Sequence, residues 1–222
     1  MIPLWMSALT ADDIKMVITE IKTTKKGRYA LFCSDGFLFS IDEETFLSFE
    51  VRKGMELSEE DLTELRKHSD YRKALDKAFA FLSIRDHSEY ELYSKLTRSF
   101  DPETSRQAAD RVRELGYLDD RAFAERYAEE LLRKGKSLGE IRQKFASKKI
   151  PSEIASEVLG AVETDEKPLI AELIRNKYMK KLAAENGRQK VYASLLRKGF
   201  RSRDIINALN DFGDTCDEFQ EE

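Results

Sequence analysis

The chain has 222 residues, of which 41% are hydrophobic and 36% are charged, with only 10 glycines and 4 prolines. This length is enough for one large or two small domains, and the composition favours helices with solvated outer faces over a β-sandwich. Cys33 and Cys216 form no CxxC motif or Cys/His cluster, which argues against a disulfide framework and suits a reducing cytosol. No run approaches the roughly 18 apolar residues of a membrane span. The apolar N-terminus lacks a basic leader. We therefore expect a cytoplasmic protein that does not enter a membrane.

The charges are unevenly distributed along the chain. Residues 1–70 hold 9 Lys/Arg and 14 Asp/Glu, residues 71–213 hold 29 and 23, and residues 214–222 hold 0 and 5. A mildly basic body between acidic ends fits a partner with an acidic surface, such as nucleic acid or a nucleoprotein. The alternative is that long helices alternate Lys and Glu for solubility, and an excess of this size does not exclude that alternative.

Residues 1–69 predict a small antiparallel β-meander with helices. Apolar residues alternate at both ends of the stretch 14–41, and a β-prone run lies between them. Asp35-Gly36 is a two-residue hairpin signal, because both central residues of a type I′ turn need a positive φ. Such a meander is too small to be stable alone. We expect it to pack on a helix at 42–49 and on a second helix capped by Ser58 with Asp61.

From Tyr71 onward every local signal is helical. One helix is predicted to begin after Asp70, and the other helix ends are marked by capping residues and by glycines. These signals are the capping boxes Ser88/Glu91 and Ser137/Glu140, the starts at Asp101-Pro102, Asp119-Asp120, Pro151-Ser152 and Ser202, and the stops at Gly116, Gly135 and Gly199.

Three stretches of the helical region resemble one another at intervals of about fifty residues. They are Ser88-Glu-Tyr-Glu-Leu-Tyr-Ser-Lys-Leu, Ser137-Leu-Gly-Glu-Ile-Arg-Gln-Lys-Phe and Gly187-Arg-Gln-Lys-Val-Tyr-Ala-Ser-Leu. Their apolar positions align as Leu92/Ile141/Val191 and Leu96/Phe145/Leu195, with Phe100, Ile150 and Phe200 closing each repeat. A period of this length indicates an array in which each repeat buries this apolar face against its neighbours. The predicted fold is mainly α: three tandem three-helix repeats at 70–116, 117–163 and 164–213, after an N-terminal α+β part at 1–69 and before an acidic tail at 214–222.

We find no constellation of residues for catalysis, a metal or a cofactor. Gly135-Lys-Ser resembles the end of a P-loop, but Glu130 stands where that motif needs its first glycine. Asp119 and Asp120 are more typical of a helix cap than of a metal site. His68 and His87 are single histidines without a partner in sequence. These features favour a binding protein over an enzyme, because repeat arrays usually offer extended surfaces to macromolecules.

Basic residues recur after the middle helix of the second and third repeats. In a stacked array they would form a row along one edge, able to follow a series of phosphates or carboxylates. The alternative explanation is that cations are favoured at helix C-termini by the helix dipole. The candidate partner-binding residues are Arg133, Lys134, Lys136, Lys148, Lys149, Arg197, Lys198, Arg201 and Arg203.

The sequence resembles a known family, the RecX regulatory proteins, in the form found in Gram-positive bacteria. The resemblance runs from about Tyr71 to Phe212. It rests on Tyr71-x-x-Ala-Leu, on Ser88-x-x-Glu-Leu-x-x-Lys-Leu and on Gly116-Tyr-Leu-Asp-Asp-x-x-Phe-Ala. The chain departs from the family at Lys149, where glycine is usual, so we expect the left-handed helix end to be lost there.

The resemblance implies a fold of tandem three-helix repeats in a curved, elongated body. It also implies a function in recombination and DNA repair: a monomer that binds the RecA recombinase, chiefly as a filament on single-stranded DNA, and inhibits filament assembly, ATP hydrolysis and strand exchange. No catalytic residue or cofactor is implied, and direct DNA binding is expected to be weak. Two alternatives stay open, a direct DNA-binding protein that uses its three-helix units and a general helical scaffold for protein interactions.

Overall fold

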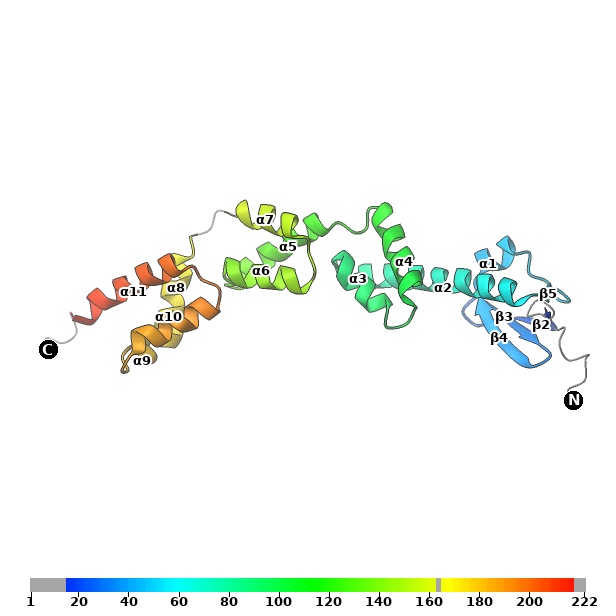
Figure 1. Ribbon diagram of the computed structural model, residues 1–222, viewed down its shortest axis with the longest axis horizontal. Coiled ribbons are helices and arrows are strands. Elements are labelled where there is room, and N and C mark those ends of the chain that lie inside the picture. Colours follow the sequence, from blue (N-terminus) through cyan, green and yellow to red (C-terminus); the bar gives the residue numbers. More distant parts are fainter. Residues whose placement is uncertain (1–14, 163–164, 218–222) are drawn as a thin grey trace, which may run out of the picture. The chain divides into compact units, whose positions relative to one another are not determined.

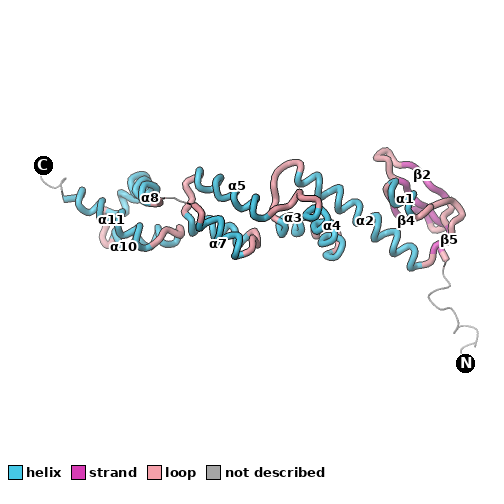
Figure 2. The backbone as a smooth tube through the Cα atoms, turned by 90° about the horizontal axis from the view of Figure 1, so that it is seen from above, coloured by secondary structure: helices cyan, strands magenta, loops and turns pink. Residues whose placement is uncertain are grey.

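The computed structural model describes residues 15–162 and 165–217, and these residues are mostly helical. They form two compact units (Figure 1), of which the first comprises residues up to 85 together with 92–117, and the second comprises 86–91 together with the residues from 118 onward. Strands are confined to the N-terminal part of the chain, and helices make up the rest (Figure 2). The predicted fold class is therefore confirmed. Residues 218–222, the last of the predicted acidic tail, lie outside the described residues.

The predicted meander is present as a three-stranded antiparallel sheet. Its strands are β2 (Glu20–Thr23), β3 (Tyr29–Cys33) and β4 (Gly36–Ile41), in the order β2-β3-β4. The predicted type I′ turn at Asp35-Gly36 is wrong, because Cys33 pairs with Gly36 and the two turn residues are therefore Ser34 and Asp35. Of Asp35 and Gly36 only the glycine has a positive φ, at 111°. β1 (Met16–Val17) pairs instead with β5 (Glu56–Leu57) in a separate sheet. The sequence did not indicate β5, because two residues are too few to show alternation.

The sheet packs on α1 (Glu43–Ser48) and α2 (Glu59–Leu82). Asp42 caps α1, and Ser58 with Asp61 forms the predicted capping box of α2. The expected helix start at Asp70 is wrong, since α2 runs through this residue without a break. Neither Ser69 nor Asp70 interrupts the helical backbone, and Asp70 instead pairs with Lys73 at 2.7 Å, one turn further along the same helix.

Two shorter helices complete the helical part of the first unit. α3 (Glu89–Leu96) contributes its residues from Leu92 onward, and α4 (Pro102–Glu114) packs along α2. Asp101 accepts a hydrogen bond from the backbone N–H of Thr104 at 2.9 Å, as predicted for a cap followed by proline. The helix ends at Gly116, whose φ of 79° is the left-handed conformation that glycine adopts at little cost.

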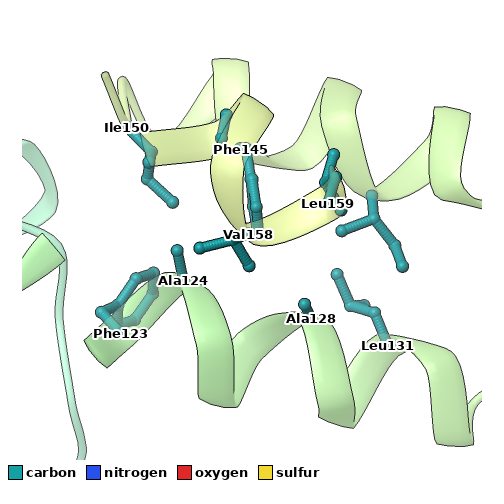
Figure 3. Close-up of a cluster of buried hydrophobic side chains, with 10 residues drawn as sticks. Phe123, Ala124, Ala128, Leu131, Phe145, Ile150, Val158 and Leu159 are labelled. Carbon is teal, nitrogen blue, oxygen red and sulfur yellow. The ribbon is translucent and has the colours of Figure 1, made fainter. Parts of the chain in front are cut away.

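The second repeat consists of α5 (Asp120–Arg133), α6 (Leu138–Ser147) and α7 (Ser152–Gly160). In Figure 3 the α5 side chains of Phe123, Ala124, Ala128 and Leu131 face Phe145 of α6 and Val158 and Leu159 of α7. Ile141 and Phe145 are fully buried. They occupy the positions that the repeat pattern predicted for the core. The cluster lies within residues 123–159, so the prediction that each repeat buries its apolar face against its neighbours is wrong for this repeat, which buries it between its own three helices. The buried cluster is Phe123, Ala124, Ala128, Leu131, Ile141, Phe145, Ile150, Ala155, Val158 and Leu159.

The third repeat begins with one bent helical segment, made of α8 (Lys167–Leu173), the π-helical turn η2 (Ile174–Tyr178) and α9 (Met179–Leu182). α10 (Gly187–Arg197) and α11 (Ser202–Asp217) follow, and Val191, Leu195 and Phe200 are buried as the repeat pattern predicts.

The π-helical turn was not predicted, but the apolar spacing explains it. Ile170, Ile174, Tyr178 and Leu182 are spaced four residues apart and all belong to the same hydrophobic cluster. An α-helix has about 3.6 residues per turn, so three steps of four residues exceed three turns by about one residue. The wider π-helical turn takes up that extra residue and keeps all four side chains on the buried face.

Among residues 15–162 and 165–217, no helix combines the length and the apolar character needed to cross a membrane.

Candidate partner-binding surface

The structure places the predicted basic residues of the second repeat in two different environments. Arg133 and Lys149 are exposed. Lys134 pairs with Glu130 one turn earlier on α5, and Lys136 pairs with Glu140 at 2.9 Å. These are partly exposed surface pairs, which contribute little to stability but lower the local positive charge. The predicted row is therefore partly neutralised within the protein itself.

Lys148 is the most constrained of the predicted residues. Its Nζ lies 2.9 Å from an Oε atom of Glu91, and the two side chains are only 21% and 18% exposed. The ammonium group also lies over the rings of Phe123 and Tyr127, at 5.5 and 5.2 Å from their centroids. A cation held by a carboxylate and two aromatic faces is already satisfied. Lys148 thus has a structural role in the second unit.

The backbone around Lys148 belongs to a hydrogen-bonded junction, which we call the first joint, formed by Ser88, Asp120 and Lys148. Ser88 Oγ donates to the carbonyl of Lys148 at 3.1 Å and accepts from the N–H of Glu91 at 3.2 Å. Asp120 Oδ1 accepts from the N–H of Glu89 at 2.8 Å. Ser88, at the start of α3, therefore also satisfies a backbone carbonyl at the end of α6. Burial raises the pKa of Asp120 above its ordinary value, and the nearby charges of Glu89 and Asp119 add to the rise.

The same arrangement recurs one repeat later, in a second joint formed by Ser137, Glu166 and Lys198. Ser137 Oγ donates to the carbonyl of Lys198 and accepts from the N–H of Glu140 at 3.0 Å. Glu166 Oε1 accepts from the N–H of Leu138 at 2.7 Å. The Glu166 side chain is buried, and this burial raises its pKa above the ordinary value. In both joints a carboxylate at the start of the first helix of a repeat accepts a hydrogen bond from the start of the preceding middle helix.

Each joint is followed by a residue in the left-handed conformation. Gly199 has a φ of 83°, and Lys149 has a φ of 55°. The expected loss of the left-handed helix end at Lys149 is therefore wrong. The N–H of Lys149 bonds to the carbonyl of Ala146 at 3.0 Å, and the N–H of Ile150 bonds to that of Phe145 at 3.1 Å. These two bonds, together with burial of Ile150, hold the lysine in a backbone conformation that glycine adopts more readily.

The predicted basic residues of the third repeat are mostly exposed. Arg197 lies 3.5 Å from Ser194 Oγ, and Arg201 is close enough to Glu166 to lower the pKa of that carboxyl, against the larger effect of burial. Arg203 is exposed, and among the described residues it has no ion pair or side-chain hydrogen bond. Six predicted residues thus remain exposed, and Lys134 is the one of them that is held in an ion pair. The other five, which form no ion pair among the described residues, are Arg133, Lys149, Arg197, Arg201 and Arg203.

The acidic and glycine motifs of the second repeat have structural roles. Asp119 accepts from the N–H groups of Arg121 and Ala122 at 2.9 and 3.0 Å, so it is the cap of α5. Gly135 has a φ of 67° after the end of α5, and Ser137 caps α6. Within the described parts of the chain, no group of three or more His, Cys, Asp or Glu side chains is arranged to hold a metal ion.

His68 lines a surface cleft of about 380 Å³ in the first unit, beside Phe49 and Tyr71. Its Nδ1 lies 2.9 Å from Thr45 Oγ1, and its ring meets the edge of Phe49 at 5.5 Å between centroids. Thr45 also donates to Asp42 at 2.8 Å. The histidine thus ties α1 to α2 through a packed and hydrogen-bonded contact.

Sequence reasoning missed a second group of basic residues. Residues 173–184 include Arg175, Lys177, Lys180 and Lys181 and contain no Asp or Glu. They lie on η2 and α9, and all but Lys181 are exposed. The acid-free run was visible in the sequence as a charge pattern. It was not noticed because it lies outside the aligned repeat segments.

Proteins of one known family share the three-helix domains of this chain. Family models described as the first and second three-helix domains of RecX match residues 74–111 and 119–159. The regulatory protein RecX of Bacillus velezensis is 33% identical over 200 residues, which cover 86% of this chain and 75% of that protein. The chain belongs to the RecX family. The RecX protein of Lactobacillus johnsonii is 35% identical over 153 residues, covering 68% of this chain and 56% of that protein.

Two solved RecX structures share the fold. A crystal structure of regulatory protein RecX superposes with a TM-score of 0.68 at 23% identity, covering 88% of this chain and 99% of that chain. RecX from Lactobacillus salivarius gives a TM-score of 0.56 at 22% identity, covering 64% of this chain and 96% of that chain. The two predictions that these comparisons bear on, the family and the three-helix domains, are confirmed.

Proposed function

We propose that this RecX-family chain binds the RecA recombinase, chiefly as the filament on single-stranded DNA, and inhibits filament assembly, ATP hydrolysis and strand exchange. The observation that carries the proposal is family membership, since the relatives are named regulatory proteins. Tandem three-helix repeats support it, because several weak contacts along a repeating partner add to a strong one when the modules are linked. Regulation by binding alone requires no catalytic residue.

Within this proposal, the exposed predicted residues are the candidates for contact with the filament. Arg133, Lys149, Arg197, Arg201 and Arg203 present positive charge to solvent. The DNA of such a filament carries phosphate charges in a regular series, and complementary charges accelerate association and set its dependence on salt. Lys134, Lys136 and Lys148 are assigned to the protein's own structure instead, because their side chains form ion pairs. Lys198 stays a candidate, since the second joint uses its backbone carbonyl and not its side chain.

The test is the single-stranded-DNA-dependent ATPase of the cognate RecA, titrated with the full chain, with binding of the chain to bare DNA measured in parallel. Inhibition at substoichiometric amounts, together with weak binding to bare DNA, would support a filament regulator. An unchanged ATPase would contradict the proposal. Inhibition only when the chain saturates the DNA would contradict it as well, in favour of a DNA-binding protein or a helical scaffold.

A further inference from the structure

The positive charge of the helical region is concentrated in its third repeat. Residues 165–212 hold eleven Lys/Arg and six Asp/Glu, whereas residues 119–162 hold nine and eight. In the second repeat many of the cations are tied to carboxylates, including Arg121 to Glu157, Arg126 to Asp86 and Lys134 to Glu130. The first helical segment of the third repeat, α8–η2–α9, has no comparable set of acidic partners along residues 173–184.

The π-helical turn decides which side chains of this segment face solvent. If the α-helix continued past Ile174, Lys177 would follow Ile170 and Ile174 toward the buried face, because residues three and four apart share a face. The π-helical turn instead brings Tyr178 and Leu182 to the hydrophobic cluster and leaves Lys177 and Lys180 exposed. Met179 between them is 43% exposed. The two lysines are therefore presented outward by the backbone.

The segment is held in place by its other cations. Arg175 lies over the ring of Phe212 on α11 at 5.7 Å, and Lys181 Nζ lies 2.9 Å from Ser194 Oγ on α10. Figure 1 shows α8 and α9 next to α10 and α11 in this part of the chain. Within the described residues, Lys177 and Lys180 have no ion pair, side-chain hydrogen bond or ring contact. Two unpaired ammonium groups thus stand on a helical segment that is fixed to its neighbours.

The acidic groups closest in sequence to this face are Glu172 and Glu185. Glu172 Oε1 lies 3.5 Å from Asn176 Nδ2, and the backbone carbonyl of Glu185 accepts from Lys190 Nζ at 3.0 Å. Neither is paired with Lys177 or Lys180 in an ion pair of the described structure.

We propose that Lys177 and Lys180, on the η2–α9 face of the third repeat, contact the phosphate backbone of DNA. Lysine is a point charge suited to phosphate, whereas it is depleted at the core of protein–protein interfaces. This choice of residue favours DNA over an acidic protein surface. The inference rests on the proposed function for its partner, the DNA of the filament, and it assigns that DNA contact to a face outside the row predicted from the repeats.

The experiment measures binding of the full chain to a fluorescein-labelled oligothymidylate and to a duplex of equal length, by fluorescence anisotropy over a series of salt concentrations. The test variant is Lys177→Glu/Lys180→Glu. The matched control is Arg52→Glu/Lys53→Glu, which changes two exposed cations of the N-terminal unit and alters the net charge equally. Lys177→Gln/Lys180→Gln serves as a milder second variant, and circular dichroism checks that each variant is folded.

We expect the test variant to bind oligothymidylate at least about tenfold more weakly and the control to bind as the wild type does. The slope of log affinity against log salt should fall by about 1.4, because each lost contact with a single strand removes about 0.7. If the test variant binds only the single strand or only the duplex more weakly, that DNA is the one whose phosphates the lysines contact. Wild-type binding that is absent at low salt, or an equal loss in test and control, would overturn the inference.

Measuring RecA ATPase inhibition with the same variants separates this inference from the proposed function. Loss of DNA affinity with retained inhibition supports the DNA contact and places the RecA contact elsewhere. Loss of inhibition with unchanged DNA affinity overturns the inference, because the face would then contact protein. Lysine-dependent DNA binding by a wild-type chain that does not inhibit RecA supports the inference and contradicts the proposed function.

Discussion

The two joints of the second unit use the same hydrogen bonds but are packed differently. In each, a serine hydroxyl donates to a lysine carbonyl, and a carboxylate accepts from the next backbone N–H; this carboxylate is partly buried in Asp120 and buried in Glu166. At the second joint, Gly139 and Gly199 bring two backbones together, so that a Cβ on Gly139 would lie 2.2 Å from the Gly199 carbonyl oxygen. At the first joint the corresponding positions hold Tyr90 and Lys149.

The ion pairs formed by side chains around the two joints also differ. Lys148 pairs with Glu91 at the first joint, whereas Glu140, at the corresponding position of the second joint, pairs with Lys136. Side-chain contacts therefore contribute more to the stability of the first joint, and close backbone packing contributes more to the stability of the second. A repeated motif can keep its hydrogen bonds while its packing changes, because the bonds depend on helix ends and the packing depends on individual side chains.

The largest effect is expected from adding one methyl group at the second joint. Gly139→Ala should lower the free energy of unfolding by about 3 kcal/mol, since the Cβ meets backbone that cannot move aside and overpacking typically costs about 1–3 kcal/mol. Gly160→Ala is the matched control, because a Cβ there meets nothing within 4 Å. Urea unfolding of the full chain measures both. A Gly139→Ala chain as stable as the control would show that the backbones are not in close contact.

The buried carboxylate of the second joint should make stability depend on pH. Because the pKa of Glu166 is raised by folding, the folded chain binds this proton more tightly than the unfolded chain. The free energy of unfolding should therefore fall as pH rises from the ordinary glutamate value through the raised value. Glu166→Gln keeps an acceptor for Leu138 and should abolish this part of the pH dependence.

Glu166→Ala is the complementary variant, because it leaves the Leu138 N–H without its partner. It should lower stability by about 1–3 kcal/mol, the usual effect of an unsatisfied buried group. Urea unfolding across acidic to neutral pH measures both variants. Equal pH profiles for the wild type and Glu166→Gln would contradict a buried, titrating Glu166.

Removing the side chains of the two joint lysines, Lys148 and Lys198, should change the free energy of unfolding by different amounts. Lys148→Ala should lower the free energy of unfolding by about 1–2 kcal/mol, because it leaves the partly buried Glu91 without its cation and removes packing on two rings. Lys198→Ala keeps the backbone carbonyl that Ser137 uses and should change stability by less than about 0.5 kcal/mol. Equal effects in urea unfolding would mean that the two joints are packed alike.

An effect of opposite sign is expected at the residue after the first joint. Lys149→Gly should raise the free energy of unfolding by about 1 kcal/mol, because a left-handed backbone is strained for any residue with a Cβ. Lys149→Ala, which keeps the Cβ, should leave stability close to that of the wild type. Thermal and urea unfolding measure the pair, and a destabilised Lys149→Gly would show that the lysine side chain itself supports the turn.

Local signals predicted much of the fold. Ser58, Asp101, Ser137 and Gly116 mark helix ends because capping depends on residues that are close in sequence. Apolar positions such as Ile141 and Val191 were assigned to the core because helical periodicity places them on one face. Asp70 was misread as a cap, since a capping residue inside a helix looks the same in sequence as one at its start.

The candidate surface was harder to predict than the fold. Lys148 and Arg203 look alike as cations after a helix, yet the first is held by Glu91 and two aromatic rings while the second is exposed. Lys177 gave no sign of exposure, because its orientation depends on a π-helical turn set by Tyr178 and Leu182.

The sequence by itself determined the helical repeats, most of their ends and their apolar faces, because these follow from interactions within one helical turn or from its periodicity. Only the tertiary structure decided that Ser88 and Ser137 bond to carbonyls about sixty residues away, that Asp120 is partly buried and Glu166 buried, and which lysines remain unpaired. Those features depend on which helix end meets which carboxylate, and that meeting is set by the packing of whole repeats.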